Sequence, residues 1–321
     1  MDDRTGRLSR RDTLRMALGA SAGLALRPFD LLADEMGSGG PEAAQLVTKP
    51  IPSSGERLPV VGIGTARRYD VAASEPDLAP LREVVRQFPR LGGRLIDTAP
   101  SYGNAETVVG NLVAQAANRD QLFLATKVGR GRDGVQAGRA EMEQSLKRLQ
   151  VDRVDLLQVH NLAGVDAMLP VLREWKASGR TRYIGVTSTA KDQYAEVERL
   201  LRTQPMDFLQ VDYAIDNREV EQRILPLAQE RGVAVLAALP FGRGRVFEAF
   251  AQQPVPGWAQ ELGIRTWPQF ALKYLVSHPA VVAAIPGTAK LEYLTDNLGA
   301  ARGPMPDAAA RRRMAALVDA A

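Results

Sequence analysis

The chain has 321 residues, 45% of them hydrophobic and 24% charged, which is enough apolar material for the core of one large domain or two ordinary ones. Its net charge of +4 does not indicate a nucleic-acid partner, because the arginines from Arg4 to Arg27 account for the excess and the remainder is close to neutral. The absence of cysteine excludes thiol nucleophiles, disulfides and cysteine-ligated zinc.

The first residues resemble a twin-arginine export signal. Ser9-Arg10-Arg11-Asp12 precedes a mildly apolar stretch, rich in Ala and Gly, over residues 16–26. A helix needs about 20 apolar residues to span a bilayer, so this stretch is too short. We therefore expect residues 1–45 to be a signal and linker recognised by the twin-arginine export machinery. The mature protein would then be periplasmic or exported, with no stable membrane span. The alternative is an amphipathic N-terminal helix on a cytoplasmic protein.

Short apolar runs alternate with segments of helical spacing through the remaining residues, 46–321. The predicted strands are residues 58–65, which could also be the arm of a hairpin, and residues 94–97, 122–127, 154–160, 183–187, 208–211, 233–238 and 281–285. The predicted helices are residues 81–88, 105–116, 138–149, 167–178, 191–201, 219–231 and 267–277. Continuous apolar strands between amphipathic helices indicate parallel strands buried on both faces.

This alternation predicts an α/β fold, specifically a closed (β/α)₈ TIM barrel over residues 46–321. An open, doubly wound sheet is the alternative. The open sheet is disfavoured because no Gly-x-Gly-x-x-Gly motif follows the first predicted strand: Gly62-Ile63-Gly64-Thr65-Ala66-Arg67 contains only the first two glycines.

Polar residues stand at the ends of three consecutive predicted strands. Asp97 ends the second strand and Tyr102 follows it, Lys127 ends the third strand, and His160 ends the fourth. Each alone has an ordinary structural explanation, such as a turn residue or a packing anchor. Because parallel barrel strands end at one face, the four side chains are expected to converge there as a catalytic site.

The chemistry of the four residues is coherent. A phenol has an unperturbed pKa near 10, which is high for proton exchange at neutral pH. A neighbouring ammonium stabilises the phenolate, and a carboxylate holds the ammonium in place. We therefore expect Tyr102 to be the proton donor, Lys127 to lower its pKa and Asp97 to anchor Lys127. His160 would orient a substrate oxygen.

The order Asp97, Tyr102, Lys127 and His160 at successive strand ends resembles the aldo/keto reductase family, from about residue 58 to residue 297. The resemblance implies a (β/α)₈ barrel that transfers hydride between a nicotinamide cofactor and an aldehyde or ketone. In that reaction Tyr102 would act as the general acid and base.

The resemblance also implies cofactor-binding residues. Ile184-Gly185-Val186-Thr187-Ser188 is similar to the family segment whose last two residues hold the nicotinamide carboxamide, and Gln210 matches the glutamine that shares this task. Pro240 and Gly242 belong to the loop after residues 233–238. The segment from Ile285 is similar to the one that binds the adenosine phosphate, and its candidate residues are Gly287, Thr288, Lys290, Tyr293 and Asn297.

Four positions depart from the family pattern. Ser188 replaces a usual Asn, and Ala238 replaces an aromatic residue that stacks on the nicotinamide. Gly287 replaces a common lysine and Tyr293 an arginine that clamps the 2′-phosphate, although Lys290 offers a partial substitute. We expect NADP as the cofactor, with NAD as the alternative.

Two other functions remain open at this point. A Schiff-base aldolase could use Lys127, and a non-catalytic module could hold the cofactor without turnover. No metal site is expected, because the two histidines lie on distant elements and offer too few ligands. The expected partner is a small-molecule carbonyl substrate, and the expected assembly state is a monomer.

Overall fold

The computed structural model describes residues 45–321, and the predicted twin-arginine segment lies outside this range. Gln45–Ala321 form one compact unit. Within this unit, no helix has the length and apolar character that crossing a membrane requires.

Eight strands form one parallel sheet in which each strand pairs with the next along the chain. They are β3 (Ile63–Gly64), β4 (Leu95–Asp97), β5 (Phe123–Val128), β6 (Val154–Val159), β7 (Thr181–Ser188), β8 (Phe208–Asp212), β9 (Ala234–Ala238) and β10 (Val281–Ala284). The two edges also pair, since Gly62 N–H donates to the Ala284 carbonyl and Gly64 N–H to that of Pro286, both at 2.9 Å. These bonds confirm the predicted (β/α)₈ barrel and exclude the open sheet.

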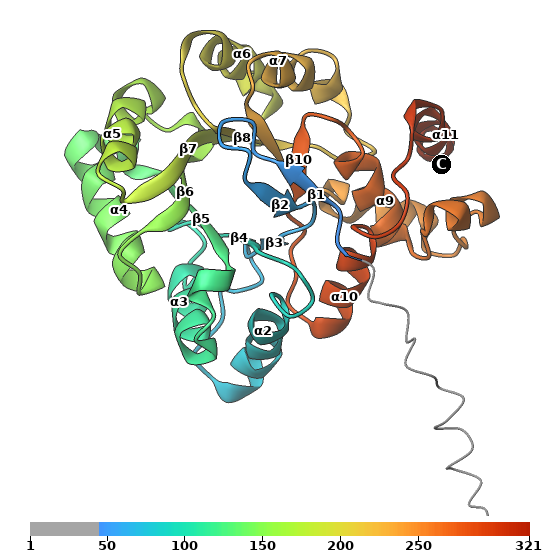
Figure 1. The fold of residues 1–321 in the computed structure, drawn as a ribbon, viewed down its shortest axis with the longest axis horizontal. Helices are drawn as coiled ribbons and strands as arrows, with labels where there is room; N and C mark the ends of the chain where they lie inside the picture. Colours follow the sequence, from blue (N-terminus) through green and yellow to red (C-terminus); the bar gives the residue numbers. More distant parts are fainter. Residues whose placement is uncertain (1–44) are drawn as a thin grey trace, which may run out of the picture. The chain divides into compact units, whose positions relative to one another are not determined.

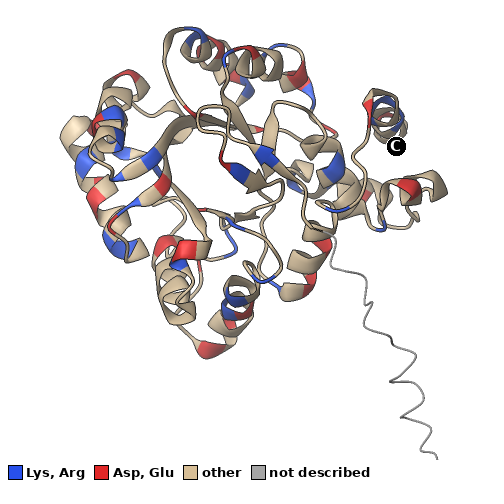
Figure 2. Ribbon diagram, in the orientation of Figure 1, with Lys and Arg blue, Asp and Glu red and all other residues tan. Residues whose placement is uncertain are grey.

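Helices surround the strands, as Figure 1 shows. They are α2 (Glu75–Gln87), α3 (Ala105–Ala116), α4 (Val135–Leu149), α5 (Val165–Ala177), α6 (Tyr194–Thr203), α7 (Ile224–Glu230), α8 (Arg245–Phe250), α9 (Trp267–Val276), α10 (Leu291–Gly299) and α11 (Ala308–Asp319). Every helix predicted with bounds is present, with some shifted ends, whereas the sequence patterns gave no bounds for α8, α10 and α11. Basic and acidic residues are interspersed on the outer helices (Figure 2), as the ion pairs Arg82–Glu75 and Arg139–Glu174 illustrate.

The barrel interior follows the two-residue period of a strand. Phe123 and Ala125 of β5 belong to an inner apolar cluster, whereas Leu124 and Val128 belong to the cluster under the helices. Alternate residues point to opposite faces of a sheet. Lys127 has the same phase as Phe123 and Ala125, so its side chain also points into the barrel.

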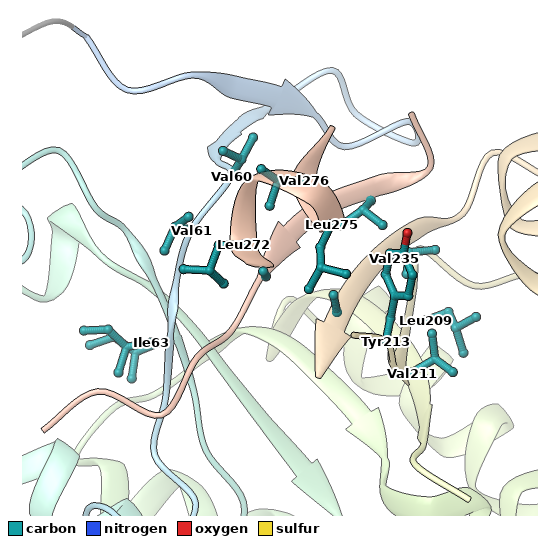
Figure 3. Close-up of a cluster of buried hydrophobic side chains, with 14 of the residues drawn as sticks. Val60, Val61, Ile63, Leu209, Val211, Tyr213, Val235, Leu272, Leu275 and Val276 are labelled. Atoms are coloured by element: carbon teal, nitrogen blue, oxygen red, sulfur yellow. The ribbon is translucent and has the colours of Figure 1, made fainter. Parts of the chain in front are cut away.

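The outer cluster packs helices onto the strands. Figure 3 shows Leu272, Leu275 and Val276 of α9 beside Val61 and Val235, residues of the barrel wall. These side chains are fully buried. Burying such a side chain contributes roughly 1.5–3 kcal/mol, so this packing fixes the wall on which the polar residues stand.

A hairpin covers the N-terminal end of the barrel. Its strands are β1 (Thr48–Pro50) and β2 (Arg57–Pro59), which pair antiparallel. Nζ of Lys49 donates to the carbonyl of Val281, where β10 begins, at 2.9 Å. Residues 58–65 are therefore not one continuous strand, and the alternative of a hairpin arm holds for Leu58 and Pro59 only. Val60 N–H still bonds Val47 of the hairpin, whereas Gly62 N–H bonds Ala284 of the barrel, so the chain changes partners in the middle of this run.

Candidate active site

Polar side chains line the barrel where its strands end. Asp97 ends β4, Lys127 is the penultimate residue of β5, and Gln158 and Gln210 have the inward phase on β6 and β8. All four side chains are buried. The inward-pointing residues of these strands are apolar in the barrel interior and polar at the C-terminal ends. They therefore form a polar layer at the C-terminal face of the barrel.

The centre of this layer is an ion pair between Lys127 and Asp97. Nζ of Lys127 donates to Oδ2 of Asp97 at 2.7 Å and to the carbonyl oxygen of Thr98 at 2.9 Å. The two residues are only 0% and 2% exposed. Burial by itself lowers the pKa of Lys127, but the Asp97 carboxylate and the Tyr102 phenol outweigh it, so the pKa is raised. Burial raises the pKa of Asp97, and the ammonium of Lys127 opposes that shift. Lys127 is thus held as an ammonium.

Tyr102 lies between Lys127 and His160. Nζ of Lys127 is 5.0 Å from the centroid of the Tyr102 ring. The rings of Tyr102 and His160 meet edge to face, with centroids 5.8 Å apart and planes at 83°. The structure therefore places the four predicted catalytic residues side by side, on or just after three adjacent strands.

A glycine turn fixes the loop that carries Tyr102. Gly103 has a φ of +59°, and a Cβ added there would lie 2.1 Å from Oδ1 of Asp70. This carboxylate oxygen accepts a hydrogen bond from Asn104 N–H at 2.9 Å. Only glycine combines this backbone conformation with such close approach, so the residue after Tyr102 lets the loop after β3 pack against the loop that carries Tyr102.

His160 is held as a neutral imidazole. Its pKa is lowered to about 3, first by burial and then by the positive charges of Lys127 and Arg132. The hydroxyl of Ser101 lies 3.3 Å from Nδ1 of His160. In the tautomer that accepts this bond, the Nε2 proton is available to a substrate oxygen.

We expect His160 to remain neutral from pH 8 down to pH 5. The pKa of histidine is about 6.5 in an unfolded chain and about 3 for His160 in the fold. The unfolded state therefore binds more protons between these values, so the contribution of His160 to the free energy of unfolding is present above about pH 6.5 and falls as the pH drops towards 3. Imidazole NMR signals assigned with a His160→Gln variant test this. A titration midpoint near pH 6.5 would contradict the neutral site.

The residues predicted to hold a carboxamide stand beside the ion pair. Nε2 of Gln210 lies 3.4 Å from Oδ2 of Asp97, and Oε1 of Gln210 accepts a bond from Gln158 at 3.0 Å. Thr187 accepts a bond from the backbone N–H of Asn161 at 3.0 Å. On the described part of the chain, Oε1 of Gln158 is buried without a hydrogen-bond partner. A buried oxygen of this kind lowers the stability of the fold unless a ligand or a water molecule donates a hydrogen bond to it.

Ser188 is buried at the end of β7, and its hydroxyl donates to Oε1 of Gln193 at 2.8 Å. Pro240 and Gly242 are buried in the loop after β9. There Asp216 approaches Gly242 and binds Nε of Arg245 at 2.7 Å. The loops after β7 and β9 are therefore fixed by bonds within the protein.

The residues predicted near an adenosine phosphate lie between the end of β10 and α10: Gly287, Thr288, Lys290, Tyr293 and Asn297. Nδ2 of Asn297 donates to Oγ1 of Thr288 at 3.1 Å, and both side chains are buried. Tyr293 is 52% exposed, and Nζ of Lys290 lies 5.4 Å from its ring centroid. The structure thus brings Thr288 and Asn297 into contact and leaves Lys290 and Tyr293 at the surface.

The sequence matches the model of the Aldo/keto reductase family over residues 60–315. The chain belongs to the aldo/keto reductase family. Similar proteins include the aldo-keto reductase YhdN of Bacillus subtilis, 33% identical over 189 residues, which cover 55% of this chain and 56% of that protein. The alignment therefore spans little more than half of the YhdN chain.

Two further relatives of this aldo/keto reductase align with more of the chain. An aldo-keto reductase of Mycobacterium avium is 28% identical over 247 residues, covering 75% of this chain and 80% of that one. The crystal structure of an aldo/keto reductase from Klebsiella pneumoniae in complex with NADP and acetate is 26% identical, with a TM-score of 0.70. It covers 82% of this chain and 92% of its own.

Several groups of this aldo/keto reductase site were not anticipated from the sequence. They are the Thr98 carbonyl that binds Lys127, the amide of Gln158, the Ser101 hydroxyl beside His160, and the charge of Arg132. Gln158 had a detectable signal, because it precedes His160 by two residues and shares its inward phase. The other three depend on loop conformations that strand periodicity does not encode.

Proposed function

We propose that this aldo/keto reductase catalyses the NADPH-dependent reduction of an aldehyde or ketone, and the reverse oxidation of the alcohol. The observation that carries the proposal is the phenol of Tyr102 beside a buried ammonium, with a neutral imidazole against its ring. This arrangement can deliver one proton to a carbonyl oxygen and compensate the charge left behind.

The residues present fit a nicotinamide cofactor. Amide and hydroxyl groups of Gln210, Thr187 and Ser188 stand at neighbouring strand ends and suit a carboxamide, and the buried Oε1 of Gln158 still needs a donor. Further round the rim, Thr288 and Asn297 are in contact beside Gly287, which faces the side chain of Arg68. The NADP complex of the Klebsiella pneumoniae protein supports the same choice of cofactor.

Each catalytic residue has one task. NADPH, when bound, supplies the hydride. Tyr102 donates its hydroxyl proton to the carbonyl oxygen, and the ammonium of Lys127 stabilises the phenolate that remains. Asp97 holds Lys127 in position and keeps it charged. Neutral His160 donates a hydrogen bond to the same carbonyl oxygen and orients it towards Tyr102.

The state of Lys127 disfavours the aldolase alternative. A Schiff-base lysine must lose its proton to attack a carbonyl, which requires a lowered pKa. The pKa of Lys127 is raised instead, and its ammonium is bound by Asp97 and by the Thr98 carbonyl. The non-catalytic alternative is disfavoured because all four predicted catalytic groups are present and adjacent.

A fluorescence titration tests the proposed cofactor. We expect quenching of tryptophan emission, with energy transfer to the bound nicotinamide, on addition of NADPH. NADH is expected to bind more weakly. If neither nucleotide changes the spectrum at millimolar concentration, the reductase proposal fails.

We further propose that the enzyme is exported as a folded, cofactor-loaded monomer through the twin-arginine route. The support is the sequence Ser9-Arg10-Arg11-Asp12 before a short apolar stretch, and the origin of all four catalytic groups from one chain. An Arg10→Lys, Arg11→Lys double variant should remain in the cytoplasm, as cell fractionation would show. Export of this variant at the wild-type level would contradict the signal assignment.

A further inference from the structure

Two exposed arginines, Arg67 and Arg68, follow β3 at the C-terminal face of the barrel. Their loop is fixed, because the backbone N–H groups of Arg68 and Tyr69 both donate to the Thr65 carbonyl at 3.0 Å. The hydroxyl of Thr65 in turn donates to the Asp97 carbonyl at 3.0 Å. The loop with the two arginines is therefore tied to the strand that carries the catalytic carboxylate.

The side chain of Arg68 lies across Gly287. Gly64 and Gly287 form a parallel bridge where the two edge strands, β3 and β10, meet and close the barrel. The loops after β3 and β10 therefore run side by side. A Cβ added at Gly287 would lie 3.3 Å from Cγ of Arg68 and 3.6 Å from its Nε. The stem of Arg68 thus occupies the space where a side chain at position 287 would begin.

The guanidinium of Arg68 has no ion pair or hydrogen bond with residues 45–321. Lys290, the cation on the segment after β10, differs in this respect. Its Nζ lies 3.6 Å from a carboxylate oxygen of Glu292 and 5.4 Å from the centroid of the Tyr293 ring. Arg68 is therefore the cation beside Gly287 whose charge is not already partly neutralised by the protein.

We propose that Arg68 binds the 2′-phosphate of NADPH, as a cation beside Gly287, the position at which the family pattern commonly has a lysine. This inference rests on the proposed function. A guanidinium matches phosphate oxygens with two parallel hydrogen bonds, which a lysine cannot form. Because NADH lacks this phosphate, Arg68 is a specificity-determining residue that favours NADPH over NADH.

The test is a pair of fluorescence titrations, with NADPH and with NADH, on wild type, Arg68→Ala and Arg67→Ala. Hydrogen bonds between charged groups contribute more to the binding free energy than neutral ones do. Arg68→Ala should therefore weaken NADPH binding roughly 10- to 100-fold. Its NADH affinity should stay at the wild-type value. Arg67→Ala is the matched control, since it removes an adjacent exposed arginine, and it should leave both affinities unchanged.

A rescue variant sharpens the test. Removing the Arg68 side chain clears the space over Gly287, so Gly287→Lys in the Arg68→Ala background should recover part of the lost NADPH affinity. An equal loss for NADPH and NADH in Arg68→Ala would overturn the proposal, because it would place Arg68 on the shared diphosphate. Unchanged NADPH binding would overturn it too. If wild type binds neither nucleotide, the proposed function itself fails.

Discussion

Tyr102→Phe is expected to lower kcat for carbonyl reduction by about 10²–10⁴-fold, the usual range for loss of a general acid. The substitution removes one hydroxyl and keeps the ring, so the edge-to-face contact with His160 and the contact with Lys127 are retained. NADPH affinity should therefore stay close to the wild-type value. Steady-state kinetics with an aldehyde, and fluorescence titration of the cofactor, measure the two quantities separately.

A Ser101→Ala variant is a useful comparison for Tyr102→Phe. It also removes one hydroxyl from the same loop, but this hydroxyl contacts Nδ1 of His160 and has no proposed role in proton transfer. We expect a much smaller loss of kcat, seen mainly as a raised KM because His160 is less well oriented. Equal losses in the two variants, or a parallel loss of NADPH affinity in Tyr102→Phe, would contradict the role of Tyr102.

Lys127→Met should have a second large effect, on stability as well as on turnover. The substitution leaves Asp97 buried without its 2.7 Å cation, and Oδ1 of Asp97 has no partner among the described residues. Breaking a buried ion pair on one side costs about 3–5 kcal/mol. Urea unfolding followed by circular dichroism should show this loss in the free energy of unfolding, and kcat should fall to background.

The double variant Asp97→Asn, Lys127→Met separates stability from catalysis. Removing both charges abolishes the uncompensated buried carboxylate, so much of the lost free energy of unfolding should return. Turnover should not return, because Tyr102 still lacks its neighbouring ammonium. If the double variant recovers activity together with stability, then Lys127 acts only by holding the fold together.

The barrel and its polar centre were readable from the sequence for a physical reason. Buried parallel strands are recognisable as continuous apolar runs. Because alternate residues of a strand point to opposite faces, the polar residue at a strand end can then be assigned to the barrel interior or to the face under the helices. Asp97 and Lys127 share the phase of the inward apolar residues on their strands. The family model and the barrel confirm the family and the fold, whereas the roles of individual residues remain predictions.

Other features had no comparable signal. Helix α11 fully buries only Met314, and its apolar stripe is short, with Leu317 and Val318 partly buried against the core. The run from Leu58 to Thr65 is uniformly apolar, although half of it pairs with the hairpin and half with the barrel. The contact of Arg68 with Gly287 joins residues more than 200 positions apart, and only closure of the barrel brings them together.

The most direct test of the proposed reaction is the transfer of a deuterium label to an aromatic aldehyde from NADPH that carries deuterium at both positions of C4 of the nicotinamide. We expect deuterium at the carbinol carbon of the product alcohol, one label per NADPH consumed, with wild type and about 10²–10⁴-fold more slowly with Tyr102→Phe. Tight NADPH binding without any labelled alcohol, across a panel of aldehydes and ketones, would contradict the assignment of this site as a carbonyl reductase.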